Sequence, residues 1–143
     1  MEMHADATLT LRSKTVPAEA VTRRLELEPD HSWEPGDSLA RRRSPRMRRV
    51  DHGWALQFSA ADAGTALSGL LARVEPGADA IGDLVAEGDI RAELVLLECD
   101  GAGDRGGVDA HVARLATALG SSLTSGGESA AGSARLCTWA TTI

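Results

Sequence analysis

Large apolar side chains are scarce in this chain, and this limits the core that it can build. Leucine, isoleucine, valine and phenylalanine together account for 29 of the 143 residues. That share is close to the level of about one fifth below which highly charged chains tend to remain unfolded. The chain can therefore bury only a modest core, rich in alanine. At this length we expect one domain, residues 1–143.

Period-2 alternation predicts the strands. Residues 5–13 and 54–58 alternate between apolar and polar side chains, the pattern of half-buried strands. Residues 90–99 carry apolar side chains on both faces, which predicts a central strand buried on both sides. A last strand is expected over 136–142.

Apolar residues recur at helical spacing between these strands. A helix is expected after the N-cap candidate Asp62, and another is expected to end at Gly120, a residue type preferred just after a helix. Shorter helices are expected after Pro17 and around 81–85. The apolar stripes of the two longer helices are Leu67, Leu70, Leu71 and Val74, and Val108, Val112, Leu115 and Leu119.

The remaining segments have the composition of loops and edges. Residues 30–37 favour an ordered loop because proline, glycine and aspartate are frequent there. The arginine-rich stretch 39–50 contains Pro45, which predicts an edge strand or loop, joined to the 54–58 strand by a turn at 51–53. Residues 119–134 are rich in glycine and serine and are expected to form a flexible loop.

The order of these elements predicts an α+β fold. Strand, helix, hairpin, helices, strand, helix and strand follow one another, which favours a largely antiparallel sheet with helices on one face. Our first choice is a ferredoxin-like two-layer sandwich.

No apolar run approaches the roughly 20 residues of a membrane-spanning helix, and the start of the sequence lacks the pattern of a signal peptide. We therefore expect a cytoplasmic protein without a membrane partner.

Positive charge is concentrated in one short stretch of an acidic chain. The net charge is −6, yet six of the 15 basic residues lie within nine positions. Guanidinium groups bind carboxylates and phosphates, so this stretch is our candidate contact surface for an acidic protein or, less favoured, a nucleic acid or phosphate ligand. The simplest alternative is a solvated edge that prevents sheet-to-sheet pairing. The six residues are Arg41, Arg42, Arg43, Arg46, Arg48 and Arg49.

The loop before these arginines adds two candidate binding residues, Trp33 and Asp37. A tryptophan in an exposed loop is a good binding anchor. We nevertheless expect Trp33 to fold inward, because an alanine-rich core needs large side chains.

Acid/base or metal chemistry is a further alternative around the same loop. Asp30, His31, Asp37 and His52 would converge if the hairpin folded back on residues 30–37. Their spacing matches no metal-binding motif, and aspartates are ordinary turn formers. We therefore assign no catalytic residue and no metal to the chain.

The segment 101–106 reads GAGDRG, a literal G-x-G-x-x-G between an expected strand and an expected helix. In a dinucleotide-binding fold these glycines approach a pyrophosphate. Only 37 residues follow, and Asp100 and Asp104 would face the phosphates. We interpret the segment as a surface loop and expect no cofactor.

Several short motifs together resemble a known family. The residues Leu-Glu-Leu-Glu-Pro-Asp at 25–30, Gly-Asp at 36–37 and Gly-Trp at 53–54 precede a leucine-rich helix and the 90–98 strand. This pattern resembles the bacterial family known as domain of unknown function 4279, over residues 7–119. The resemblance implies no established reaction. It implies a role as an immunity or interaction protein in bacterial conflict loci.

Three hypotheses about function follow. The leading one is a non-catalytic binding protein, with an immunity-type role included, that uses the arginine-rich stretch and the adjacent loop to bind an acidic protein. The first alternative is a nucleic-acid or phosphate binder that uses the same arginines. The second is a hydrolase or metal enzyme at residues 30–37. The oligomeric state is left open.

Overall fold

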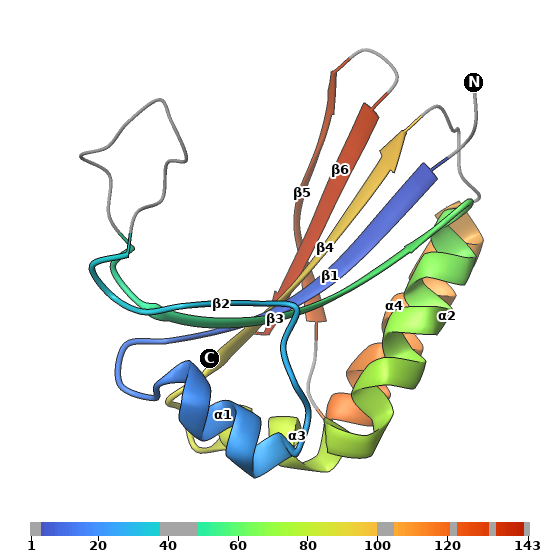
Figure 1. Cartoon of the computed structure of the whole chain (residues 1–143). Coiled ribbons are helices and arrows are strands. Elements are labelled where there is room, and N and C mark those ends of the chain that lie inside the picture. Colours follow the sequence, from blue (N-terminus) through green and yellow to red (C-terminus); the bar gives the residue numbers. More distant parts are fainter. Residues whose placement is uncertain (1–3, 38–48, 100–104, 121–122, 132–133, 142–143) are drawn as a thin grey trace.

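A computed structural model describes residues 4–37, 49–99, 105–120, 123–131 and 134–141. It has an α+β architecture in which one antiparallel sheet is covered by helices (Figure 1). No helix among these residues is long and apolar enough to cross a membrane. The elements are β1 (His4–Ser13), α1 (Ala18–Leu25), β2 (His31–Trp33), β3 (His52–Ala60), α2 (Ala63–Val74), the 3₁₀ turn η1 (Glu75–Gly77), α3 (Ala78–Ala86), β4 (Arg91–Cys99), α4 (Arg105–Leu119), β5 (Leu123–Ala131) and β6 (Ala134–Thr141).

The six strands are ordered β2-β3-β1-β4-β6-β5, and every neighbouring pair is antiparallel. This confirms the predicted α+β fold with a largely antiparallel sheet. The finer ferredoxin-like assignment stays a prediction, since that arrangement has four strands and β5 and β6 extend this sheet beyond them.

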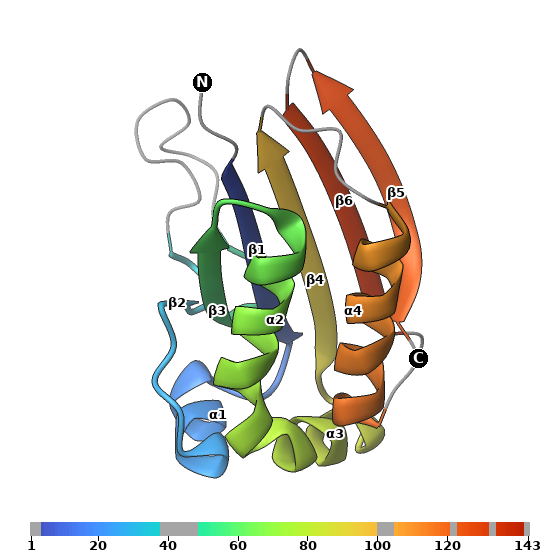
Figure 2. The ribbon, with the colours of Figure 1, turned by 90° about the vertical axis from the view of Figure 1, so that its right-hand side faces the viewer.

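The helices lie on one side of the sheet. Figure 2 shows α2 and α4 side by side in front of the strands, with α1 and α3 at one end. The strands turn their small and aliphatic residues toward these helices, as the alternation in β1 predicts: Ala5, Ala7, Leu9 and Leu11 are all at most 2% exposed. The opposite face of β1 carries Asp6, Thr8 and Arg12 instead.

The two long helices pack as their apolar stripes predict. All four stripe residues of α4 are buried, and Gly120 follows in the left-handed conformation at φ 64°. The Asp62 carboxylate caps α2 by accepting a hydrogen bond from the Thr65 backbone N–H at 2.8 Å.

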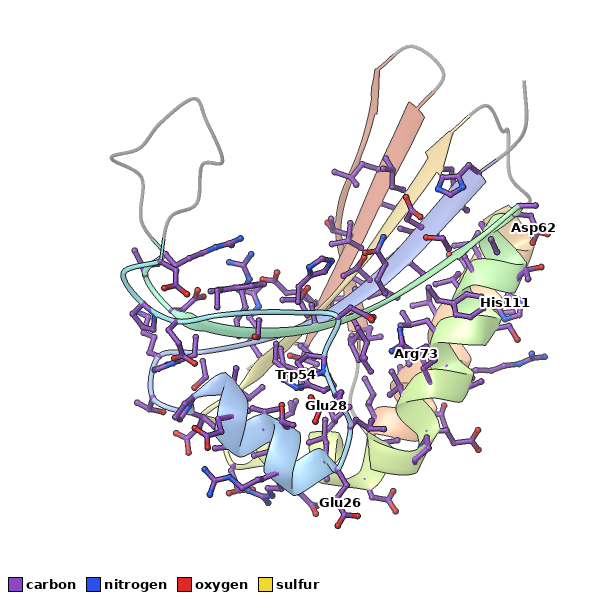
Figure 3. The ribbon with its side chains drawn as sticks, in the orientation of Figure 1. Glu26, Glu28, Trp54, Asp62, Arg73 and His111 are labelled. Atoms are coloured by element: carbon purple, nitrogen blue, oxygen red, sulfur yellow. The ribbon has the colours of Figure 1, made fainter. Side chains whose placement is uncertain are left out.

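The buried Trp54 joins α1 to the sheet. Its indole N–H donates a hydrogen bond to Thr22 Oγ1 at 3.0 Å, and Figure 3 shows the side chain on the helical side of β3. The predicted core position of Trp54 is confirmed.

Three sequence predictions about the strands were wrong: the turn at 51–53, the loop at 30–37 and the loop at 119–134. Residues 51–53 are not a turn: His52 and Gly53 belong to β3, whose hairpin partner is β2, within the segment expected to be a loop. The edge strand or loop predicted for residues 39–50 lies mostly outside the described part of the chain, because residues 38–48 are not described. The 119–134 segment contains β5 instead of being a loop throughout, because its backbone pairs with β6 although its small side chains show no alternation.

The close approach of α2 to β3 gives a stability prediction. A Cβ atom at Gly69 would lie 2.2 Å from Phe58 Cε1, whereas one at Gly64 would lie 3.3 Å from the end of the His111 side chain. Gly69→Ala is expected to lower the free energy of unfolding by about 1–3 kcal/mol through overpacking.

Gly64→Ala in the same helix is the control, because alanine favours helix and the histidine can move. It should leave stability unchanged or raise it by up to about 1 kcal/mol. Urea unfolding of both variants measures this, and equal stability of the two would contradict the predicted contact.

Candidate functional site

Trp33 lies on the face of the sheet opposite the helices, and the β2–β3 register explains why. No element in the described part of the chain covers this face, which we call the uncovered face. Trp33 is opposite Gly53. A Cβ atom at Gly53 would lie 1.8 Å from Trp33 Cε2, so the indole ring can occupy this place only over a glycine. Trp33 is half-buried there and is not part of the hydrophobic core cluster. The expectation that it folds into the core was wrong.

Two arginines and one carboxylate surround the indole ring. The Arg49 guanidinium carbon lies 4.0 Å from the ring centroid, and that of Arg12 lies 5.8 Å away. The indole N–H donates a hydrogen bond to Asp51 Oδ1 at 3.3 Å. A guanidinium stacked on an aromatic ring is held in place while its N–H edge can still bind an anion.

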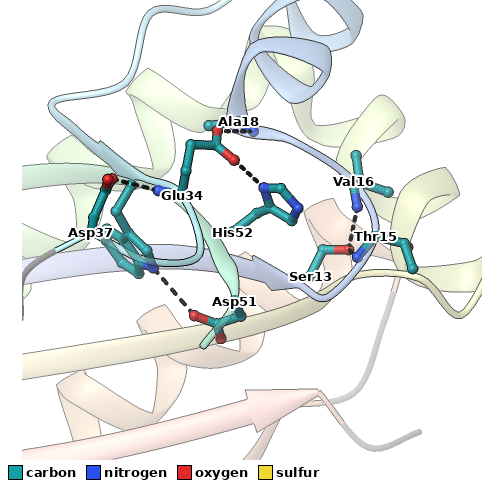
Figure 4. A network of polar contacts seen from close by, with 9 residues as sticks. Ser13, Thr15, Val16, Ala18, Glu34, Asp37, Asp51 and His52 are labelled. Carbon is teal, nitrogen blue, oxygen red and sulfur yellow. Dashed lines mark hydrogen bonds and ion pairs between the residues drawn. The ribbon is translucent and has the colours of Figure 1, made fainter. Parts of the chain in front are cut away.

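A compact turn holds Arg49 beside Trp33. The Arg49 N–H donates to the Asp37 carbonyl at 2.7 Å, and the Gly36 N–H donates to the Arg49 carbonyl at 2.9 Å. Gly36 has φ 95°, which a glycine adopts without strain. The Asp37 carboxylate accepts a hydrogen bond from the Glu34 N–H at 2.7 Å, so it shapes the turn (Figure 4).

Arg49 differs from most described arginines in having no carboxylate partner. Arg12 pairs with Glu93 at 3.2 Å, and Arg24 and Arg73 also form ion pairs. Among the side chains that the structure describes, none with a negative charge lies within ion-pair distance of Arg49. Its positive charge is therefore oriented by Trp33 without being neutralised. The other five arginines of the basic stretch, Arg41, Arg42, Arg43, Arg46 and Arg48, lie outside the described residues.

A cavity of about 420 Å³ lies beside Arg12 and Asp51, where β1 ends and β4 begins. Arg12, Lys14 and Arg91 line it together with the carboxylates of Asp51 and Glu93. Charges of both signs lie close together, so the cavity has no single strong charge preference.

Asp30 and His31, two residues of the acid/base alternative, are adjacent in the chain, and of the two only Asp30 forms an ion pair among the described residues. The Asp30 carboxylate forms an ion pair with Arg73 and accepts a hydrogen bond from the Gln57 N–H at 2.8 Å. The hydrogen bond from Arg73, followed by that from Gln57, lowers the pKa of Asp30. His31 is exposed on β2, opposite Ala55.

His52 belongs to a different network, shown in Figure 4. Its Nδ1 bonds to one carboxylate oxygen of Glu34, and the other oxygen accepts a hydrogen bond from the Ala18 N–H at the start of α1, at 3.3 Å. Among the described residues there is no group of three or more histidine, cysteine, aspartate or glutamate side chains that could hold a metal ion. The metal and acid/base alternative stays a hypothesis from the sequence.

Sequence reasoning named Trp33, Asp37 and Arg49 as candidates but did not predict how they are positioned. Gly53 and Asp51 act through the pairing of β2 with β3, a register that local patterns do not specify. The only available signal was the glycine beside Trp54, which we assigned to a turn.

Comparison with known proteins places the chain in a family. The family model described as Domain of unknown function (DUF4279) matches residues 1–124, and the chain belongs to this family. The match extends from β1 through α4 to the start of β5. Searches of curated proteins and of solved structures gave no match.

The Asp30–Arg73 ion pair, which joins the residue before β2 to α2, gives a pH prediction. Because the pKa of Asp30 is lower in the folded protein than in the unfolded chain, its contribution to stability is present above the unfolded pKa, near about 4, and is lost as the pH falls through the lowered folded pKa. Asp30→Asn should therefore lower the melting temperature at pH 6 and have little effect below the folded pKa.

The expected effect at pH 6 is small, under about 1 kcal/mol, because both side chains are partly exposed. Asp109→Asn, at an exposed position of α4, is the control for the loss of one surface carboxylate. Thermal unfolding between pH 2 and 7 measures both variants. A destabilisation by Asp30→Asn that is the same at every pH would refute the prediction.

Proposed function

We propose that this protein is a non-catalytic binding protein that holds an acidic protein partner at the Trp33 end of the uncovered sheet face. The observation that carries the proposal is the Arg49 guanidinium, stacked on Trp33 at 4.0 Å. No described carboxylate neutralises it. A cation that is already ordered loses less entropy when a carboxylate binds, which favours recognition at this point.

The distribution of charge supports an acidic partner. Arg49 is the last of six arginines within nine positions, while the rest of the chain has nine basic and 21 acidic residues, a net charge of −12. A basic stretch in an otherwise acidic chain attracts an acidic partner locally, while the rest of the chain repels it, which favours one orientation of binding. An immunity-type role is one instance of such binding.

Nucleic acid is the competing partner for the same arginines. Base-stacking sites usually contain several exposed aromatic side chains. The chain has three tryptophans, one phenylalanine and no tyrosine, and Trp54 and Trp139 are buried. The shortage of exposed aromatic residues favours a protein partner.

Binding of fluorescent poly-L-glutamate at 50 mM salt tests the proposal by anisotropy. Arg49→Gln should weaken binding about five- to tenfold, the loss expected for one charge-assisted contact. Arg49→Lys should restore only part of the affinity, because an ammonium group lacks the planar stack on Trp33. Arg114→Gln, an exposed arginine on α4, is the matched control and should change little.

Two results would contradict the proposal. Equal losses for Arg49→Gln and Arg114→Gln would mean that only net charge matters. Tighter binding of duplex DNA, with affinity falling steeply with salt at a slope of about −0.9 per phosphate contacted, would support the nucleic-acid alternative instead.

A further inference from the structure

The strand β4 carries aliphatic side chains on the face of the sheet away from the helices. Leu94 and Leu96 are fully buried beneath the helices, so the alternating residues Val95 and Leu97 face the other way and are half-buried. On β6, Leu136 lies opposite Leu97 and is 37% exposed. None of the helices α1–α4 lies on this face (Figure 1).

These three residues are unusual for their position. An antiparallel sheet with one solvated face normally has polar residues on that face. β1 follows this rule with Asp6, Thr8 and Arg12. Val95 lies between Thr8 and Thr138, and Leu97 lies between Asp6 and Leu136, so the aliphatic residues form a small patch on the two interior strands β4 and β6. The sequence had predicted that β4 is buried on both sides, and in the described part of the chain no element covers the second side.

The patch lies on the same face of the sheet as Trp33 and the three side chains around its ring, Arg12, Arg49 and Asp51. Arg12 and Glu93 form an ion pair on this face, between Trp33 and the β4 residues, since Arg12 lies 5.8 Å from the Trp33 ring. An aliphatic centre with charged groups at its edge is the usual composition of a protein-binding surface. The aliphatic part supplies affinity, and the charges steer the encounter.

We propose that Val95, Leu97 and Leu136 are the apolar centre of the docking surface whose charged edge is the Arg49–Trp33 stack. The inference rests on the proposed function and names the partner more closely: an acidic protein surface that presents aliphatic side chains among its carboxylates. Charge complementarity to Arg49 selects this occupant over a neutral apolar one.

Two labelled peptides of equal length and charge test the inference with the full chain. One repeats Glu-Glu-Leu-Ser and the other repeats Glu-Glu-Ser-Ser. The leucine peptide should bind about tenfold more tightly, since burial of one aliphatic side chain contributes enough for that ratio. Leu136→Ser and Val95→Thr should abolish this preference without changing the affinity of the serine peptide.

Val85→Thr is the matched control, because Val85 is a half-buried valine on the helical side, in α3. It should keep the tenfold preference. Arg49→Gln should weaken both peptides equally and so preserve the ratio.

The outcomes separate the two proposals. Equal affinity of the two peptides, with Arg49→Gln still weakening both, would overturn the apolar centre and leave the proposed function standing. Absence of binding by either peptide would overturn both. A concentration-dependent dimer in light scattering that Leu136→Ser abolishes would show that the occupant is a second copy of the chain, and would overturn the acidic partner.

Discussion

In the part of the chain that the structure describes, helices cover the sheet on one face only, and the rest of the structure depends on this constraint. With 29 leucine, isoleucine, valine and phenylalanine residues, the chain fills a single layer between sheet and helices. Small residues make that layer thin: alanines on β1 and Gly69 on α2 allow the helix to approach the strands closely. Among the described residues, no helix packs on the second face of the sheet, so side chains on that face can contact a partner.

The position of Trp33 follows from this arrangement. The pairing of β2 with β3 places the indole ring over Gly53 on the uncovered face, where it orders Arg49. The same face carries Val95, Leu97 and Leu136 in its interior. A residue expected to fill the core thus lies on the same face as an apolar patch, with the Arg12–Glu93 ion pair between them, and the two features together support a binding role better than either does alone.

Local periodicity predicted the elements that bury a continuous apolar stripe. β1, α2 and α4 were found in this way, and so was the α+β class, because alternation and helical spacing are properties of neighbouring residues. β5 was missed because its glycines, serines and alanines show no alternation, and its strand conformation comes from pairing with β6. The pairing of β2 with β3 was missed because residues 34–51 separate the two strands. Local sequence patterns do not specify how strands so far apart in sequence are paired.

In the candidate site, too, local sequence predicted some features, and strand pairing determines the others. Residue chemistry was enough to select Trp33, Asp37 and Arg49 from the sequence. It could not show that Trp33 rests on Gly53, that Asp51 accepts a hydrogen bond from the indole N–H, or that the outer residues of β4 share a face with Trp33, since each depends on how strands distant in sequence are paired. The structure also separates Asp30 and His52 into two networks, each of which ties a residue flanking β2 to a helix.

The most direct test of the account is methyl and indole NMR of the chain during titration with the leucine-bearing glutamate peptide. We expect the methyl signals of Val95, Leu97 and Leu136 and the Trp33 indole signal to shift together, while those of Leu70 and Ile81 in the core stay in place. Shifts confined to residues of α1–α4, with the β4 methyl signals unchanged, would contradict the claim that the uncovered face is the binding surface.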